Sequence, residues 1–217
     1  MRIKTIDASL DCQLCPRLVS FRHDNEAKHP SFFNSPVPSF GEGSASLLIV
    51  GLAPGLKGAN QTGRPFTGDY AGDTLFLTMK KVGFASGEFK KVATDSLELH
   101  DVCITNAVRC VPPQNKPTSD EILTCRPFLI NQIERMQKKN LRILLSLGKI
   151  SHDTVLKTFG LKLSAYPFKH KAVHQLPNGL TLVDSYHCSR YNVNTGRLTE
   201  EMFLEVFELI KSLSHKE

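Results

Sequence analysis

Hydrophobic positions along the chain form four short apolar runs separated by longer amphipathic stretches. The runs have the length and continuous apolar character of buried parallel strands, and they lie at 47–50, 101–107, 141–147 and 180–184. Apolar residues at helical spacing predict helices over about 69–82, 118–138 and 148–159, and a last one from 199 onward. This alternation predicts an α/β fold, a three-layer α/β/α sandwich with a central four-stranded parallel sheet.

The first 46 residues are interpreted as an N-terminal arm that packs onto this sandwich. Leu14, Leu18 and Phe21 indicate a short helix, and the Pro-rich and Phe-rich stretch 29–43 should be irregular but held in place. With 217 residues, 41% of them hydrophobic, the chain can bury one substantial core. We therefore expect a single domain over residues 1–217, with the arm 1–46 attached to it.

A long polar loop, residues 51–73, follows the first predicted strand. It lacks the Gly-Lys-Ser/Thr of a phosphate loop, and Gly51, Gly55 and Gly58 do not have the spacing of the dinucleotide fingerprint. We interpret these glycines as permitting close approach of the backbone to a bulky ligand. In open α/β sheets ligands bind beyond the carboxyl ends of the strands, so this loop is a candidate site.

Two further polar loops, 106–113 and 186–197, begin at the carboxyl ends of other predicted strands. Because parallel strands end at the same edge of a sheet, side chains from all three loops are expected to meet in one pocket. The net charge of +6 and the pI of about 9.0 favour an anionic partner without identifying it. No signal peptide and no bilayer-spanning apolar run is found, so a cytoplasmic protein with no membrane partner is expected.

Four of the six cysteines form a candidate metal-binding set. Cys12 and Cys15 are paired as C-x-x-C, and Cys110 and Cys125 are the natural second pair. Four thiolates suit either a structural Zn²⁺ or a [4Fe–4S] cluster, and the spacing alone leaves both open. Cys103 lies inside a predicted strand and is interpreted as a small buried apolar residue.

Three segments carry a resemblance to a known family: GLAPGLKGANQTGRPFTGD, TNAVRCVPPQNKPT and HCSRYNVNTGRLT. They resemble the signature segments of the family 5 (type b) uracil-DNA glycosylases. The stretches CQLCPRLVSFR and CRPFL resemble the iron–sulfur segments shared by families 4 and 5. Family 4 is less similar, because it usually has an acidic residue where this chain has Leu52.

The resemblance implies a monofunctional glycosylase of DNA base excision repair. Such an enzyme flips a damaged base out of the duplex and hydrolyses its N-glycosidic bond, here for uracil and also for other deaminated bases such as hypoxanthine. It also implies a [4Fe–4S] cluster, which ties in the arm and is held by Cys12, Cys15, Cys110 and Cys125. We further expect a monomer that acts on damaged DNA at the nucleoid of a prokaryotic cell.

The family pattern also assigns roles in the pocket. Phe66 matches the aromatic residue that stacks on uracil, and the Asn106 amide can accept from uracil N3–H and donate to O4. His187 matches the histidine that donates to O2 as negative charge develops there. The base pocket is completed by residues of the first motif, namely Gly51, Ala53 and Gly55.

The residue that positions the attacking water is expected to be Asp69. Family 1 enzymes carry an acid where this chain has Ala53 and a bulky tyrosine where it has Gly55, so the pocket is expected to be roomier. Asp69 in the TGD segment is the acid that the family 5 pattern offers instead. The same side chain can also cap the following helix.

The third motif supplies most of the expected DNA contacts. Tyr191 lies where the superfamily inserts a side chain into the space left by the flipped base, and phosphate contacts are expected from Arg190, Arg197 and Lys57. The motif usually reads His-Pro-Ser, and Cys188 replaces the proline here. We expect Cys188 to be exposed in this loop, which loses the fixed φ of proline.

Two other interpretations compete with this one. A non-catalytic iron–sulfur DNA-binding module is favoured by the missing acid at Ala53, and a family 4-type glycosylase would be strict for uracil. Release of free base from damaged duplexes separates all three.

Overall fold

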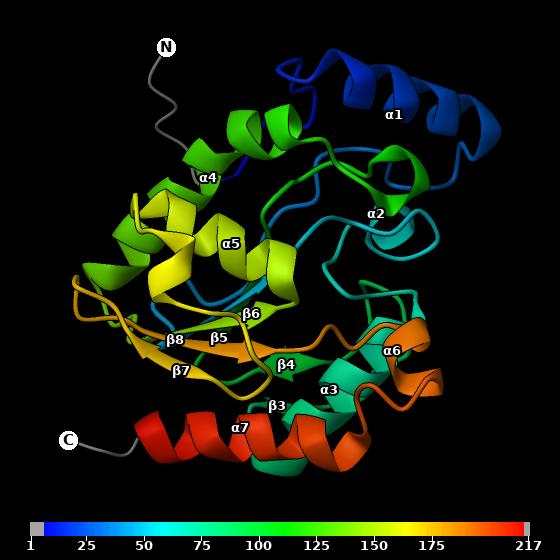
Figure 1. Cartoon of the computed structure of the whole chain (residues 1–217). Helices are drawn as coiled ribbons and strands as arrows, with labels where there is room; N and C mark the ends of the chain where they lie inside the picture. Colours follow the sequence, from blue (N-terminus) through cyan, green and yellow to red (C-terminus); the bar gives the residue numbers. More distant parts are fainter. Residues whose placement is uncertain (1–6, 215–217) are drawn as a thin grey trace.

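The computed structural model describes residues 7–214, and its centre is a six-stranded sheet in the order β1-β5-β2-β6-β8-β7 (Figure 1). In that order the strands are Phe40–Gly41, Val102–Asn106, Leu47–Gly51, Ile143–Leu147, Thr181–Ser185 and Val173–Gln175. The four inner strands are parallel, which confirms the predicted core of the sheet. Each edge carries a short antiparallel strand, β1 or β7, that is too brief to show a periodic pattern.

Two helical layers cover the sheet (Figure 1). Helices α4 (Ser119–Gln137) and α5 (Lys149–Thr158) pack on one face, and α3 (Tyr70–Val82) and α7 (Glu200–Ser214) pack on the other. Alternate residues of the inner strands enter the two apolar clusters, as Leu48 and Ile49 of β2 do. Because both faces are buried, the strands are continuous apolar runs in the sequence.

The remaining elements are short, apart from the helix of the arm. They are α1 (Pro16–Lys28), α2 (Ala59–Thr62), the β3–β4 hairpin (Ala85–Ser86 and Glu98–Leu99), the 3₁₀ turns Pro113–Asn115 and Leu163–Ala165, and α6 (Arg190–Asn194). The hairpin lies between the predicted helix 69–82 and the predicted strand 101–107, where the sequence indicates no element. Among the helices of residues 7–214, none is both long and apolar enough to cross a membrane.

Side-chain caps mark the starts of three of the four helices that cover the sheet. Thr118 and Glu121 form a capping box at the start of α4, Asp69 accepts from Gly72 N in α3, and Thr199 accepts from Met202 N in α7. Each cap supplies an acceptor for backbone N–H groups that have no partner within the helix.

The arm is held by charged groups that reach into the domain. Arg17 of α1 donates through Nε and Nη2 to the two carboxylate oxygens of Glu121, each at 2.7 Å. Arg109, which is fully buried, donates to Ser39 of the arm at 3.0 Å and to Gln132 of α4 at 2.8 Å. Burial lowers the pKa of Arg109, and the nearby Asp7 carboxylate opposes that shift. Residues 1–6 of the predicted arm lie outside the described part.

The Arg17–Glu121 pair makes a testable contribution that depends on pH. Burial alone would raise the pKa of Glu121, but hydrogen bonds from Arg17 and from the Thr118 N–H lower it. The stabilisation is therefore present above the unfolded carboxyl pKa of about 4.3 and is lost as pH falls through the lower folded value. Glu121→Gln keeps the cap but removes the charge, so it should cost roughly 0.5–1 kcal/mol at pH 7.

Urea unfolding of wild type and Glu121→Gln between pH 7 and pH 2.5 measures this difference. The gap should close in acid, where the wild-type carboxyl is also neutral. Glu134→Gln, at an exposed position of the same helix, is the matched control and should show no gap at any pH. A gap that persists unchanged at the lowest pH would contradict the charge-based explanation.

Candidate active site

A cavity of about 750 Å³ lies beyond the carboxyl ends of β2, β5 and β8. The loops after these three strands supply most of its wall. The site residues expected from the sequence that line it are Ala53, Gly55, Lys57, Phe66, Asp69, Asn106, His187 and Arg190.

Asn106 is placed by the pairing of the two central strands. It is the last residue of β5 and lies opposite Gly51, the last residue of β2. Its side chain is buried, yet within residues 7–214 no group hydrogen-bonds to its amide. Since a buried amide needs partners, this one is available for a ligand in the cavity.

Gly51 makes this arrangement possible, because a side chain there would occupy the same space. A Cβ at position 51 would overlap Asn106 Oδ1 and lie 2.8 Å from Phe66 Cζ. Phe66 itself has a positive φ of 54°, which is rare for a non-glycine residue. The backbone of Gly72 packs against the Phe66 carbonyl oxygen, where a Cβ would not fit.

His187 faces the same space from the loop after β8. Its ring lies 6.0 Å from that of Phe66 at an interplanar angle of 29°. Its backbone carbonyl accepts from Asn192 Nδ2 at 2.8 Å. Burial lowers the pKa of His187 below its ordinary value, and the Asp69 carboxylate opposes that shift. The ring is therefore neutral at pH 7 and carries one N–H donor.

Asp69 serves as the helix cap and also borders the cavity. A Cβ at Gly55 would lie 3.0 Å from Asp69 Oδ2, and one at Gly58 would lie 2.9 Å from its Cγ. These glycines, like Gly51, make room for side chains of the protein. This differs from the expectation that they admit a bulky ligand, because the loop folds back onto the start of α3.

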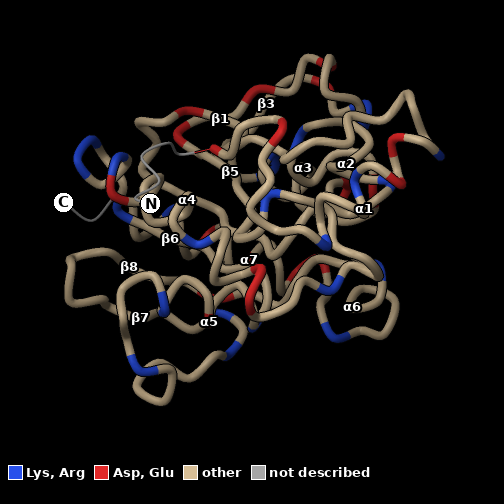
Figure 2. Tube along the Cα trace, turned by 90° about the horizontal axis from the view of Figure 1, so that it is seen from above, with Lys and Arg blue, Asp and Glu red and all other residues tan. Residues whose placement is uncertain are grey.

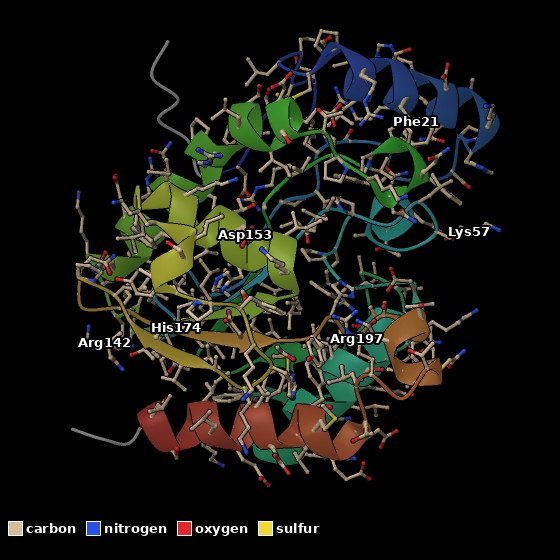
Figure 3. All side chains as sticks on the ribbon, viewed as in Figure 1. Phe21, Lys57, Arg142, Asp153, His174 and Arg197 are labelled. Carbon is tan, nitrogen blue, oxygen red and sulfur yellow. The ribbon has the colours of Figure 1, made fainter. Side chains whose placement is uncertain are left out.

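The residues expected to contact DNA are spread around the opening. Arg190 lines the cavity and lies 5.5 Å above the Tyr70 ring, within cation–π range. Lys57 is exposed at the outer edge of the molecule (Figure 3). Arg197 lies outside this cavity, over the Tyr186 ring at 4.8 Å, and lines a second hollow of about 290 Å³ that also contacts His187.

Tyr191 does not line the cavity, and its side chain is 72% exposed on α6. It projects from the same short helix as Arg190. Figure 2 shows basic positions on and beside this helix. The Tyr191 ring is therefore open to solvent, next along the chain to a residue that lines the cavity.

Cys188 is not exposed, which corrects the expectation from the sequence. Its side chain is fully buried, and its Sγ donates to the Ala71 carbonyl at 3.4 Å. The thiol joins the loop after β8 to the first turn of α3. Burial raises the pKa of Cys188, so the group stays a neutral thiol.

Among the lining residues that the sequence analysis did not single out are Tyr70, Asp73, Lys91 and Asn115. Lys91 pairs with Asp73 at 2.7 Å. Asn115, which lies within the second motif, has a positive φ of 56°, a conformation to which asparagine is well suited. Tyr70 and Asp73 belong to the candidate loop 51–73 and Asn115 to a motif, so the sequence offered a local signal for these three but none for Lys91.

The four candidate metal ligands line one small cavity between α1, α4 and the segment after β5. Burial raises the pKa of Cys15 to about 11 and that of Cys110 to about 12, so neither would ionise without a cationic partner. The Arg109 backbone N–H donates to Cys125 Sγ at 3.4 Å, as in sites that stabilise thiolates. Cys103 lies apart in β5, where its sulfur accepts from Gln132.

Comparisons with known proteins identify the family. A model of the uracil DNA glycosylase superfamily matches residues 38–211. The chain belongs to the uracil-DNA glycosylase superfamily. A type-5 uracil-DNA glycosylase of Thermus thermophilus is 43% identical over 208 residues, 94% of each chain. A type-5 enzyme of Pyrobaculum aerophilum is 37% identical over 205 residues, 93% of this chain and 88% of its own.

A type-4 uracil-DNA glycosylase of Sulfurisphaera tokodaii is less similar, with 31% identity over 189 residues, 82% of this chain and 76% of its own. The expected resemblance to family 5 is therefore confirmed. So are the fold class and the activity, that of a hydrolytic DNA glycosylase that excises uracil in DNA repair. The non-catalytic alternative is not supported.

The space at position 51 gives a direct test of this site. Gly51→Ala should displace the Asn106 amide or the Phe66 ring and lower uracil excision by at least about tenfold, because small misplacements in a site are costly. Gly43→Ala is the matched control, since a Cβ there meets nothing within 4 Å. Single-turnover excision should be normal in the control, and equal activity of the two variants would contradict the steric assignment.

Proposed function

We propose that this uracil-DNA glycosylase binds the flipped uracil between Phe66, Asn106 and His187. The observation that carries the proposal is the Asn106 amide, which is buried, unpaired within residues 7–214 and directed by β5 to the cavity. An amide can accept from uracil N3–H and donate to O4, whereas cytosine presents the reverse pattern. Phe66 supplies the aromatic face on which the base stacks.

His187 would donate its N–H to uracil O2 while the N-glycosidic bond breaks. Cleavage leaves an oxocarbenium-like sugar and an anionic base, so the O2 atom gains negative charge in the transition state. A neutral imidazole fits this role, because burial holds the pKa of His187 below its usual value. A hydrogen-bond donor directed at the oxygen that becomes negative binds the transition state more strongly than the ground state. It therefore lowers the barrier to bond cleavage.

Asp69 would position the attacking water and favour the cationic sugar. One of its oxygens accepts from Gly72 N, while the other lies against Gly55 at the cavity wall. Ala53 borders the same wall and has no group that could take either role. Lys57, Arg190 and Arg197 would contact phosphates, and the exposed Tyr191 would enter the space left by the flipped base.

Removing either polar group that binds the base tests these assignments. Asn106→Ala and His187→Ala should each slow single-turnover release of uracil by roughly tenfold to a thousandfold. Binding to a duplex that contains an uncleavable uracil analogue should change little. Asn140→Ala and His23→Ala, which alter exposed residues outside the cavity, are the controls. Full activity of either site variant would refute its role.

We also propose that Cys12, Cys15, Cys110 and Cys125 hold a [4Fe–4S] cluster. Their convergence on one cavity supports this, and so does the buried Arg22, whose charge opposes the rise in the pKa of Cys110 caused by burial and whose Nε has no partner within residues 7–214. Thiolates bound to a cluster would supply the negative charge that the buried Arg22 guanidinium would otherwise lack beside it. The cluster would join the arm to α4 and would not take part in the chemistry.

Protein purified without oxygen should contain about four iron and four sulfide per chain, as four cysteine ligands of one [4Fe–4S] centre require. Cys110→Ala should lose the cluster and much of the stability, because the arm loses its anchor. Cys103→Ala is the matched control and should keep the iron. Stoichiometric zinc with no sulfide in anaerobically purified wild type would overturn the cluster assignment.

The base range is proposed to include hypoxanthine. Ala53 and Gly55 are small, so the cavity can admit a purine, although Asp69 Oδ2 takes part of the space beside Gly55. Wild type should release hypoxanthine as well as uracil, and it should prefer mispaired uracil because flipping then costs less. Gly55→Tyr should narrow the range of bases that the enzyme releases, because the tyrosine ring would fill the space beside Ala53.

The range of bases is measured as single-turnover release of uracil and of hypoxanthine from duplexes that carry one or the other. Because a Cβ at position 55 also contacts Asp69, Gly55→Ala is the control that separates crowding of Asp69 from filling of the cavity. Absence of hypoxanthine release by wild type at enzyme excess would defeat the proposal while leaving uracil excision intact.

Three wider expectations belong to the same proposal. Residues 1–217 would form one domain tied together by the cluster, and the enzyme would act as a monomer. Because its substrate is chromosomal DNA, it would work at the nucleoid of a prokaryotic cell. Size-exclusion chromatography with light scattering tests the monomer.

A further inference from the structure

A second group of ligating side chains lies away from the cavity that receives the base. His152 of α5, His174 of β7 and Asp184 of β8 bring one ligating atom each within 4.8 Å of one another. In Figure 3 His174 lies on the opposite side of the molecule from Lys57. None of the three lines the base cavity or the cysteine cavity, so neither uracil excision nor the cluster accounts for them.

The three side chains form a compact and nearly closed group. His152 Nδ1 lies 2.7 Å from Asp184 Oδ1, and His174 Nε2 lies 3.1 Å from Asp184 Oδ2. The side chains of His152 and Asp184 are about 1% and 0% exposed, whereas that of His174 is 12% exposed. The group is therefore reached from solvent on the side of the edge strand.

The groups that hydrogen-bond to His152 and Asp184 are of the kind found around metal ligands. His152 Nε2 lies 2.9 Å from the Tyr166 carbonyl oxygen, so it donates there and leaves Nδ1 as the ligating atom. Ser146 Oγ donates to Asp184 Oδ1 at 2.7 Å. Metal-bound histidines usually donate their second nitrogen to a carbonyl or carboxylate, and metal-bound carboxylates are themselves hydrogen-bonded.

We propose that His152, His174 and Asp184 bind one divalent transition-metal ion of the zinc class. Two imidazoles and one carboxylate are a donor set that suits Zn²⁺ and disfavours Mg²⁺ and Ca²⁺. Water can supply the fourth ligand on the side of His174. The ligating atoms would separate slightly from their hydrogen-bonded distances as the ion enters. Its role would be structural, since it would join α5 and the edge strand β7 to β8.

The test uses protein with its cysteine ligands occupied and unbound metal removed, titrated calorimetrically with ZnCl₂. Wild type should bind one equivalent and show a higher Tm with zinc. His174→Gln, at the edge of the sheet, and Asp184→Asn should each weaken binding by more than about tenfold. His23→Gln is the matched control at an exposed site and should bind like wild type.

Cobalt distinguishes this site from stray binding at thiols. Co²⁺ bound at His152, His174 and Asp184 should show weak visible bands without intense sulfur charge-transfer absorption. Absence of saturable binding by wild type would overturn the proposal and leave the three side chains as a hydrogen-bonded group without a metal. Binding that is unchanged in His174→Gln, with that variant folded by circular dichroism, would overturn it as well.

Discussion

The backbone at Gly51 is the constraint on which the base cavity depends. Parallel pairing places it opposite Asn106, and its missing side chain leaves the space that the Asn106 amide and the Phe66 ring occupy. The position is fixed by strands that are buried on both faces, so the core of the sheet cannot shift without moving the site. In the proposed site, base recognition therefore depends on the register of the central strands.

Much of the fold could be predicted, because the informative signals are local. The four inner strands are apolar runs, and the capping box of Thr118 and Glu121 marks the start of α4. The edge strands β1 and β7 could not be found, since they exist only through pairing with β5 and β8. Their sequences show no pattern of their own.

The site was predicted less completely, for a physical reason. Motifs indicate which residues matter, but they do not show what each side chain touches. The burial of Cys188 depends on its contact with the first turn of α3, and the space at Gly55 is shared with Asp69, a contact across the loop. The group of His152, His174 and Asp184 is assembled from three separate elements, and no spacing in the sequence connects them.

The attachment of the arm has a consequence for how the chain is made. Arg17 and its partner Glu121 are 104 positions apart. At a synthesis rate of about 5–20 residues per second, the arm leaves the ribosome on the order of 5–20 s before the start of α4 exists. During most of that interval Leu18, which is buried in the finished protein, lacks the later residues against which it packs. The N-terminal segment therefore reaches its final place well after its own synthesis, and in the meantime its apolar side chains and its thiols are open to aggregation and oxidation.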